Sequence, residues 1–288
     1  MTQPQGDIAI LTDSSCDLPQ QYFKKYPIFR LPLIVTCGET AYRDGVDLTA
    51  DEVYRRQPDE GFKTSLPLLE DVNATFDAIA RAGYRQVVVL PLSSALSSTT
   101  NQLRLIAAER TDLEITVFDT RRCASAGLGM LAVQAAQYAV SGMDFVRLKE
   151  VVARLIEDTT VFFCIDTLEY LRRGGRIGRV TAVAGALLQI KPILTFAADG
   201  QLQTIAKVRG RPQVMDKLVE HVVQRCAGNR RYNQAEANGG APEEMAQLRA
   251  RMEQLFPNYD HFWQGEMDAT LSVYIGCGAL GAGVQVLD

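Results

Sequence analysis

Residues 169–180, EYLRRGGRIGRV, place a double glycine between Arg173 and Arg176 and could hold an anion. Arginine offers a planar set of donors that suits carboxylates and phosphates, and glycine lets the backbone approach a bound group. Arg172 and Arg173 also suit the end of a helix, where cations are favourable and glycine stops the helix. Arg176 lies beyond the glycines, so it is the better candidate to reach into a site.

Hydroxyl side chains at the ends of predicted elements form a second candidate group. They occur in three turns: Ser14 after strand 7–12, Thr64 and Ser65 before helix 67–82, and Ser94 and Ser97 after strand 86–93. In a parallel sheet these turns meet at one edge, where ligands of α/β proteins bind. Each hydroxyl alone is explained as a helix N-cap. Three such turns together favour a site for a carboxylate or phosphate.

Several other chemistries are poorly supported by the sequence. There is no Walker loop, and Gly276, Gly278 and Gly281 match a dinucleotide fingerprint too close to the chain end, so a glycine-rich turn is expected. The two histidines, His221 and His261, are far in sequence from the serine-rich turns, and no G-x-S-x-G occurs. No close cluster of His, Cys and carboxylates predicts a metal site.

The bulk properties are those of an ordinary globular protein. The chain has 288 residues, 47% of them hydrophobic, and a formal net charge of −4, which disfavours a nucleic-acid-binding protein. Its six cysteines are scattered without a C-x-x-C pair, no secretory signal is visible and no apolar run reaches the ~18–20 residues of a membrane span. We expect a cytoplasmic protein without an integral membrane segment.

The pattern of elements predicts an α/β fold in two domains. In residues 1–158, apolar strands alternate with helices, as in a three-layer parallel sheet. In residues 159–288, Asp199-Gly200 between alternating runs predicts a β-hairpin, so this domain should have a mixed sheet. Three local predictions concern single segments: an extended piece at 28–36, a loop at 228–244 and a strand at 270–276. The apolar run 180–190 could be a helix that lines a tunnel.

Several motifs in this order resemble the DegV family, the fatty-acid-binding subunits of bacterial fatty acid kinase. They are ILTDSSCDLP (10–19), KTSLPLLEDV (63–72), SSALSSTTNQ (93–102), VFDTRRCASAGLGML (117–131), residues 166–194 and KVRGR (207–211). The resemblance implies two α/β domains that hold one long-chain fatty acid, such as palmitate, stearate or oleate, in an apolar tunnel between them. It implies no other cofactor and no catalytic residue of the chain's own.

By the same resemblance, the carboxylate would be held by Thr64, Ser65, Ser94, Ser97 and Arg176. Ser14, Arg209, Tyr274, Gly276 and Gly278 would support the site or face a partner, a kinase subunit that phosphorylates the bound acid. Tyr274 replaces a histidine of the family's H-x-G-P-G motif; a phenol donates a hydrogen bond but cannot become cationic. Two other functions stay open: a serine-dependent hydrolase or transferase of acyl or phospho esters, and a nucleic-acid-binding regulator.

Overall fold

The computed structural model describes residues 6–180, 190–228 and 231–287 of the chain. Its first part comprises β1 (Ile8–Asp13), the 3-10 turn η1 (Ser14–Cys16), α1 (Gln20–Lys25), β2 (Ile28–Leu31), β3 (Ile34–Cys37), β4 (Thr40–Arg43), α2 (Ala50–Arg56), β5 (Phe62–Ser65), α3 (Leu69–Arg81), β6 (Gln86–Leu90), α4 (Thr99–Glu109), β7 (Glu114–Val117), α5 (Ala126–Val140) and α6 (Phe145–Asp158). The second part comprises β8 (Thr159–Cys164), α7 (Glu169–Arg173), β9 (Ile190–Phe196), β10 (Leu202–Arg209), α8 (Pro212–Cys226), β11 (Tyr232–Gly239), α9 (Pro242–Leu255), β12 (Phe262–Glu266), α10 (Ala269–Ile275) and β13 (Ala279–Val286).

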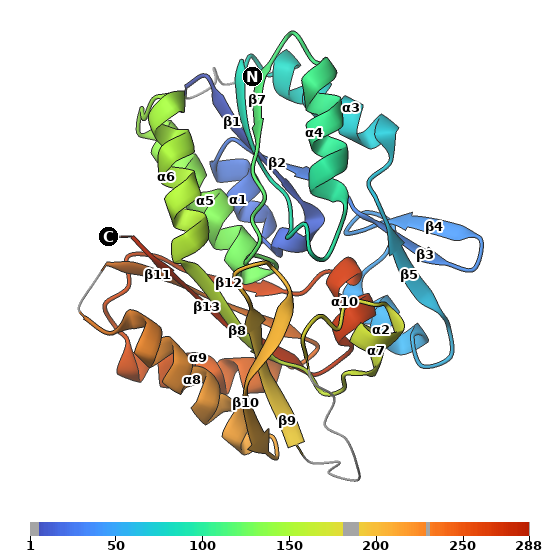
Figure 1. Cartoon of the computed structure of the whole chain (residues 1–288), viewed down its shortest axis with the longest axis vertical. Coiled ribbons are helices and arrows are strands. Elements are labelled where there is room, and N and C mark those ends of the chain that lie inside the picture. The colour runs from blue at the N-terminus through green and yellow to red at the C-terminus, as the bar shows by residue number, and fades with distance from the viewer. Residues whose placement is uncertain (1–5, 181–189, 229–230, 288) are drawn as a thin grey trace.

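A four-stranded parallel sheet in the order β2-β1-β6-β7 forms the upper half of Figure 1. Its central strands β1 and β6 are buried on both faces, because helices cover both sides of the sheet. Ile8 and Ile10 of β1 pack with α5 and α6, whereas Ala9 and Leu11 pack with α3 and α4. The predicted three-layer parallel unit is therefore confirmed.

A six-stranded mixed sheet in the order β10-β9-β8-β13-β11-β12 forms the lower half. Helices α8 and α9 cover its outer face, and α5 contacts its inner face at β13, β11, β12 and β8. The predicted hairpin at Asp199-Gly200 joins β9 to β10, which pair antiparallel. The predicted boundary between residues 158 and 159 falls at the junction of α6 and β8, and the division into domains there stays a prediction.

Helix α5 lies between the two large sheets, which explains its composition. Eleven of its fifteen residues are buried, including Gln134, and a helix that is apolar all round must be enclosed on all sides. Gly127 and Gly129 let it approach its neighbours closely, since a Cβ at either position would overlap Val161 or the Cys16 carbonyl oxygen. The helix therefore fixes how the inner face of the mixed sheet meets the parallel sheet.

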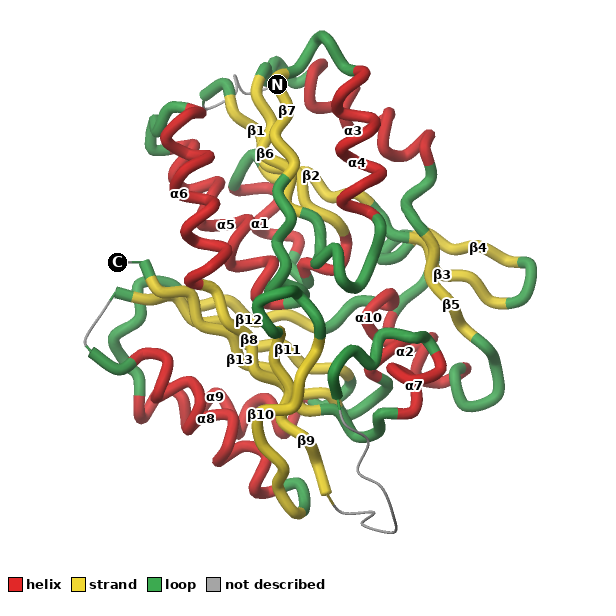
Figure 2. The backbone as a smooth tube through the Cα atoms, viewed as in Figure 1, coloured by secondary structure: helices red, strands yellow, loops and turns green. Residues whose placement is uncertain are grey.

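The extended piece predicted at 28–36 is two strands in different sheets. Pro32 separates β2, which pairs with β1, from β3, which pairs with β4 and β5 in a small antiparallel sheet. Proline lacks the N–H that a continuous ladder requires, so the chain changes direction there. This three-stranded sheet projects from the side of the molecule in Figure 2. Thr64 and Ser65 lie on its strand β5 and not in a turn of the parallel sheet, which corrects our placement of them.

The prediction of a loop at 228–244 is wrong, because eight of these residues form the buried strand β11 and residues 242–244 begin helix α9. The polar side chains of β11 explain this error, because a polar run without periodicity is typical of a loop. Hydrogen bonds offset the cost of burying some of these polar side chains. Asn233 Nδ2 donates to Gln134 Oε1 at 2.8 Å and to Gln285 Oε1 at 3.0 Å.

The strand predicted at 270–276 is also wrong, because residues 269–275 form helix α10. The Asp268 carboxylate caps the helix by accepting the Leu271 N–H at 2.7 Å, and Gly276 ends it with a φ of 67°. The closing strand of the chain is β13, which our sequence reading left out. The apolar run 180–190 lies almost wholly outside the described residues.

Candidate ligand site between the sheets

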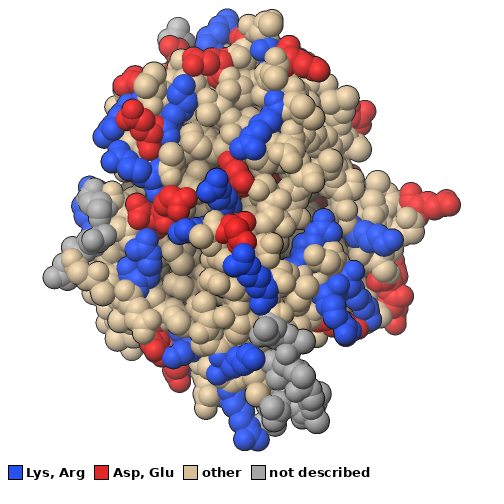
Figure 3. Space-filling model, in the orientation of Figure 1, with Lys and Arg blue, Asp and Glu red and all other residues tan. Residues whose placement is uncertain are grey.

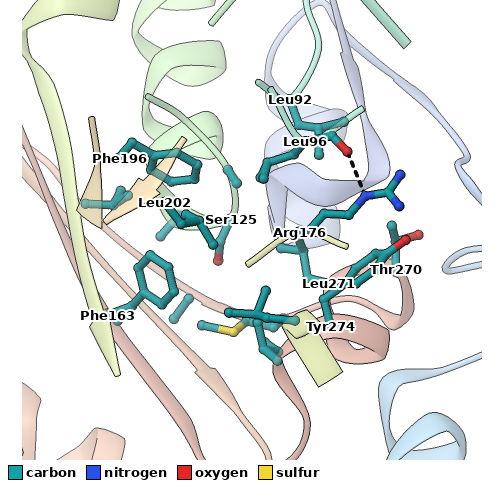
Figure 4. A pocket seen from close by; sticks show the side chains of 18 of the residues that line it. Leu92, Leu96, Ser125, Phe163, Arg176, Phe196, Leu202, Thr270, Leu271 and Tyr274 are labelled. Carbon is teal, nitrogen blue, oxygen red and sulfur yellow. Dashed lines mark hydrogen bonds between the residues drawn. The ribbon is translucent and has the colours of Figure 1, made fainter. Parts of the chain in front are cut away.

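An apolar cavity lies between the turns that follow the parallel strands and the inner face of the mixed sheet (Figure 4). It encloses about 920 Å³ between atoms, including some space that opens to solvent. Its apolar walls include Leu33, Leu92, Leu96, Val161, Phe163, Phe196, Leu202, Met267, Leu271 and Ile275.

Small residues in the centre of the mixed sheet leave room for this cavity. Gly281 of β13 pairs with Phe163 of β8 on one side and Ala237 of β11 on the other. All three residues line the cavity, and paired positions of neighbouring strands point to the same face of a sheet. A Cβ on Gly281 would make only ordinary contacts, the nearest at 3.4 Å from Phe163 Cβ. The glycine therefore widens the cavity without being forced by packing.

The polar end of the cavity joins side chains from three distant parts of the chain. Thr64 Oγ1 on β5 and the Tyr274 hydroxyl on α10 share a hydrogen bond of 2.5 Å. Arg176 lies over the Tyr274 ring with its guanidinium carbon 5.2 Å from the ring centre. Its Nε donates to the Leu96 carbonyl oxygen at 3.1 Å, the dashed line in Figure 4. These contacts fix a cation and two hydroxyls at one end of an apolar space.

The double glycine positions this cation. A side chain on Gly174 would overlap the Tyr274 ring, so only glycine fits beneath it. Gly175 has a φ of 70°, which reverses the chain after α7. The Gly174 carbonyl oxygen then accepts Arg176 Nη1 at 2.7 Å. Arg173, on the other side of the glycines, is exposed and pairs with Glu169 one turn earlier.

Five residues expected at the site line the cavity: Thr64, Ser65, Ser97, Arg176 and Tyr274. Ser97 lies in the turn after β6, where its hydroxyl shares a 2.8 Å hydrogen bond with Thr99. The structure thus brings together hydroxyls and a cation that are up to 210 residues apart in sequence.

The other five expected residues are not among those that line the cavity. The exposed Ser94 donates its hydroxyl to Asp119 Oδ2 at 2.5 Å, and Ser14 is buried and donates to Asp44 at 2.7 Å. Arg209 ends β10. Gly276 and Gly278 form the turn between α10 and β13, with φ values of 67° and 92°. The glycine-rich turn expected there is what the structure contains.

Two hydroxyl residues that line the cavity were not predicted from the sequence. Thr270 is 5% exposed and its buried Oγ1 has no hydrogen-bond partner, although it lies one helical turn before Tyr274 on α10. A helical reading of 269–275 would have placed Thr270 and Tyr274 on one face. Ser125, just before α5, also lines the cavity. Its signal is the small-residue run CASAG (123–127) before an apolar helix.

Buried carboxyl groups lie behind the turn after β1. Burial raises the pKa of Asp13 to about 6, while the N–H groups of Leu92 and Ser15 and the Ser15 hydroxyl oppose the rise. Burial and neighbouring carboxylates also raise the pKa of Asp17 and Asp268 well above the usual range. These groups tie η1 to α10, because Asp17 accepts the Asp268 N–H at 2.9 Å.

A second hollow, the outer hollow, adjoins the polar end of the cavity. The two share Thr64, Arg176 and Tyr274, so the Thr64–Tyr274 hydrogen bond lies at the boundary between them. Lys63 and Arg173 also line the outer hollow. Of these cations only Arg176 lines both spaces, whereas Glu60 also lines the outer hollow and Arg173 is paired with Glu169.

Histidines are absent from the residues that line the cavity. His221 stacks on Phe162 at 5.3 Å between ring centres, and His261 lies 5.7 Å from the Trp263 ring. Among the described residues, no three His, Cys, Asp or Glu side chains gather as metal ligands would.

No helix in the described part of the chain has both the length and the apolar character of a membrane span. Figure 3 shows basic side chains interspersed with acidic ones over the face of the molecule that is turned to the viewer in Figure 1.

The chain matches a known family model and known proteins over nearly its whole length. The family model described as "Uncharacterised protein, DegV family" matches residues 7–286. A DegV domain-containing protein of Clostridium perfringens is 35% identical over 278 residues, which cover 96% of this chain and 98% of that protein. One of Clostridium acetobutylicum is 31% identical over 274 residues, covering 95% and 97%.

Solved structures with the same fold include proteins described by their ligands. A DegV family protein from Thermus thermophilus, described as fatty acid binding, matches with a TM-score of 0.90 and 28% identity over 98% of this chain and 100% of that one. A protein from Eubacterium ventriosum, described as stearic-acid binding, matches with a TM-score of 0.87 and 27% identity over 97% and 98%.

Proposed function

This chain belongs to the DegV family, and from that premise we propose that it binds one long-chain fatty acid in the cavity between its sheets. The observation that carries the proposal is an apolar cavity with hydroxyls and a cation at one end. The ligands named for the Thermus thermophilus and Eubacterium ventriosum proteins support the same class of molecule. Palmitate, stearate and oleate are the expected ligands.

The energetics fit an acyl chain whose head is paired. About 14 methylenes, each contributing ~0.8 kcal/mol on burial, give roughly 11 kcal/mol before association costs of several kcal/mol. An unpaired buried carboxylate would cancel most of this gain. We therefore place the carboxylate against Arg176, Thr64 and Tyr274, the one end of the cavity that combines a cation with donors.

Further hydroxyls complete the proposed head site. Ser65 and Ser97 line the same cavity and would add donors to the carboxylate, Ser65 by turning its hydroxyl from the Leu66 carbonyl oxygen to the ligand. The unpartnered Thr270 Oγ1 would gain the hydrogen bond that it lacks in the structure. Ser94 enters the proposal as a support, because its hydroxyl is held by Asp119. Ser14, Gly276 and Gly278 shape the turns behind the site.

We propose a carrier without chemistry of its own, which presents the bound acid to a kinase subunit or to other lipid metabolism. Hydroxyl and arginine donors stabilise a carboxylate without supplying a nucleophile and base. Arg209, at the end of β10, belongs to the KVRGR motif by which the family resemblance implies a partner. Mixing the loaded protein with a DegV-associated kinase subunit and ATP tests this part by formation of acyl phosphate.

Native mass spectrometry of the protein purified from bacteria tests the binding itself. The expected result is a mass increase equal to a fatty acid, which organic extraction removes and added palmitate, stearate or oleate restores. Protein that is empty as purified and takes up none of the three would refute the proposal. Turnover of an acyl ester that is lost in Ser97→Ala would instead favour the hydrolase.

A further inference from the structure

Ser125 places a hydroxyl in the hydrocarbon part of the cavity. It lines the cavity, and Figure 4 shows it on the side of Phe196 and Leu202, away from Arg176 and Tyr274. Its chain neighbours Ala124 and Ala126 belong to the same apolar cluster as Phe196 and Leu202. The Ser125 hydroxyl is therefore a polar group of the cavity wall that lies apart from the proposed carboxylate site.

The hydrogen bonds of Ser125 determine what it can offer a ligand. Its Oγ donates to Asp17 Oδ2 at 2.5 Å, within the range of hydroxyl-to-carboxylate hydrogen bonds. Asp17 is held in turn by the Asp268 N–H on its other oxygen, Oδ1. A serine hydroxyl has one proton and two acceptor lone pairs. The single bond to Asp17 therefore leaves the Ser125 hydroxyl with hydrogen-bonding capacity for a second partner in the cavity that the residue lines.

The backbone at Ser125 is costly for a residue with a Cβ. Its φ is 53° and its ψ is −136°, a region where residues other than glycine are uncommon. The Ser125 N–H donates to the Ser15 carbonyl oxygen at 2.7 Å, which holds this conformation. Glycine would relieve the strain, but it would remove the hydroxyl.

We infer that the chain's preferred ligand is a fatty acid with a hydroxyl group along its hydrocarbon chain, hydrogen-bonded to Ser125 Oγ. A plain hydrocarbon would leave this capacity unused in an apolar space, whereas a chain hydroxyl, which can donate or accept, makes the second hydrogen bond. This inference rests on the proposed function, because it assumes an acyl chain in the cavity. It narrows the ligand class from fatty acids to hydroxy fatty acids.

Dissociation constants of two proteins for plain and hydroxylated fatty acids test the inference. The ligands are stearate and a series of hydroxystearates whose hydroxyl is moved along the chain, and the proteins are the wild type and Ser125→Ala. Alanine keeps the Cβ and hence the backbone strain. At the matching hydroxyl position, the substitution should weaken hydroxystearate about fivefold to tenfold more than stearate, the effect of one hydrogen bond.

Ser97→Ala is the matched control, because it removes a cavity hydroxyl from the turn after β6 and should weaken both ligands equally. If Ser125→Ala does not fold, Ser125→Gly, which suits the positive φ, is used in the same comparison. A difference below about threefold at every hydroxyl position overturns the inference, and a larger one at any position supports it. Failure of wild-type protein to bind stearate and every hydroxystearate would overturn the proposed function instead.

Discussion

The two ends of the cavity differ in how many parts of the fold they require. The polar end takes Thr64 from the small antiparallel sheet, Arg176 from the turn after α7 and Tyr274 from α10. The apolar end takes Phe163, Phe196 and Gly281 from strands or strand ends of one sheet. A charged head needs donors at fixed positions, whereas a hydrocarbon tail needs only shape. Changes at the polar end should therefore affect every fatty acid, and changes at the apolar end should depend on chain length.

Arg176→Met is expected to have the largest effect on binding. It removes the cation while keeping an unbranched side chain, so a bound carboxylate loses its charged partner. We expect about hundredfold weaker binding of palmitate and stearate alike, as when one partner of a buried ion pair is truncated. Titration calorimetry measures both affinities. Arg173→Met, which removes an exposed arginine three residues away, is the control and should change them less than about twofold. Equal losses in both variants would contradict a head-group role for Arg176.

Tyr274→Phe should weaken fatty acid binding about tenfold, because one hydrogen bond to a charged group is lost. The ring beneath Arg176 remains, so the variant isolates the hydroxyl. Binding of a fatty alcohol of the same length, which has no carboxylate, should change less. A fluorescent fatty acid displaced by each ligand gives the affinities. Equal losses for acid and alcohol would place the effect in packing and not at the head.

Gly281→Ala should separate ligands by length. The added methyl contacts Phe163 at an ordinary distance, so the protein should fold with unchanged or slightly higher stability. It narrows the apolar end, and we expect about threefold to fivefold weaker binding of stearate with a smaller change for a shorter acid. Thermal unfolding checks the fold, and calorimetry checks the affinities. A uniform loss across lengths would mean that the tail does not reach β13.

Ser94→Ala should have the smallest effect, less than about twofold on any fatty acid. Its hydroxyl is bonded to Asp119 and does not line the cavity. Competition binding with the wild type as reference measures a change of this size. A tenfold loss would show that Ser94 leaves Asp119 to contact the carboxylate directly, as the family resemblance implies.

The sequence predicted best where hydrophobic patterning decides the structure. The apolar strand predicted at 86–93 lies in the parallel sheet as β6, since burial on both faces requires such a run, and its flanking helices α3 and α4 pack on one face of that sheet. Thr64, Ser97 and Arg176 were also expected at one site. Thr64 reaches it from an antiparallel strand, however, so the argument from parallel strand ends does not explain its position.

Predictions failed where tertiary contacts override local signals. Strand β11 is polar in sequence, and some of its polarity is satisfied by Gln134 and Gln285, from segments far along the chain. Residues 269–275 carry β-branched side chains typical of strands, yet the Asp268 cap and packing against α2 favour a helix. Thr270 escaped notice with that helix, and Ser125 became a candidate only when its contact with Asp17 was seen.

The overlap that any side chain on Gly174 would make with the Tyr274 ring implies that these two positions evolve as a pair. Among homologous sequences, those that keep a bulky aromatic residue at position 274 should keep glycine at 174. Those with a small residue at 274 should tolerate substitution at 174. An alignment in which the two positions vary independently would show that the backbone around the double glycine adapts more freely than its contacts here suggest.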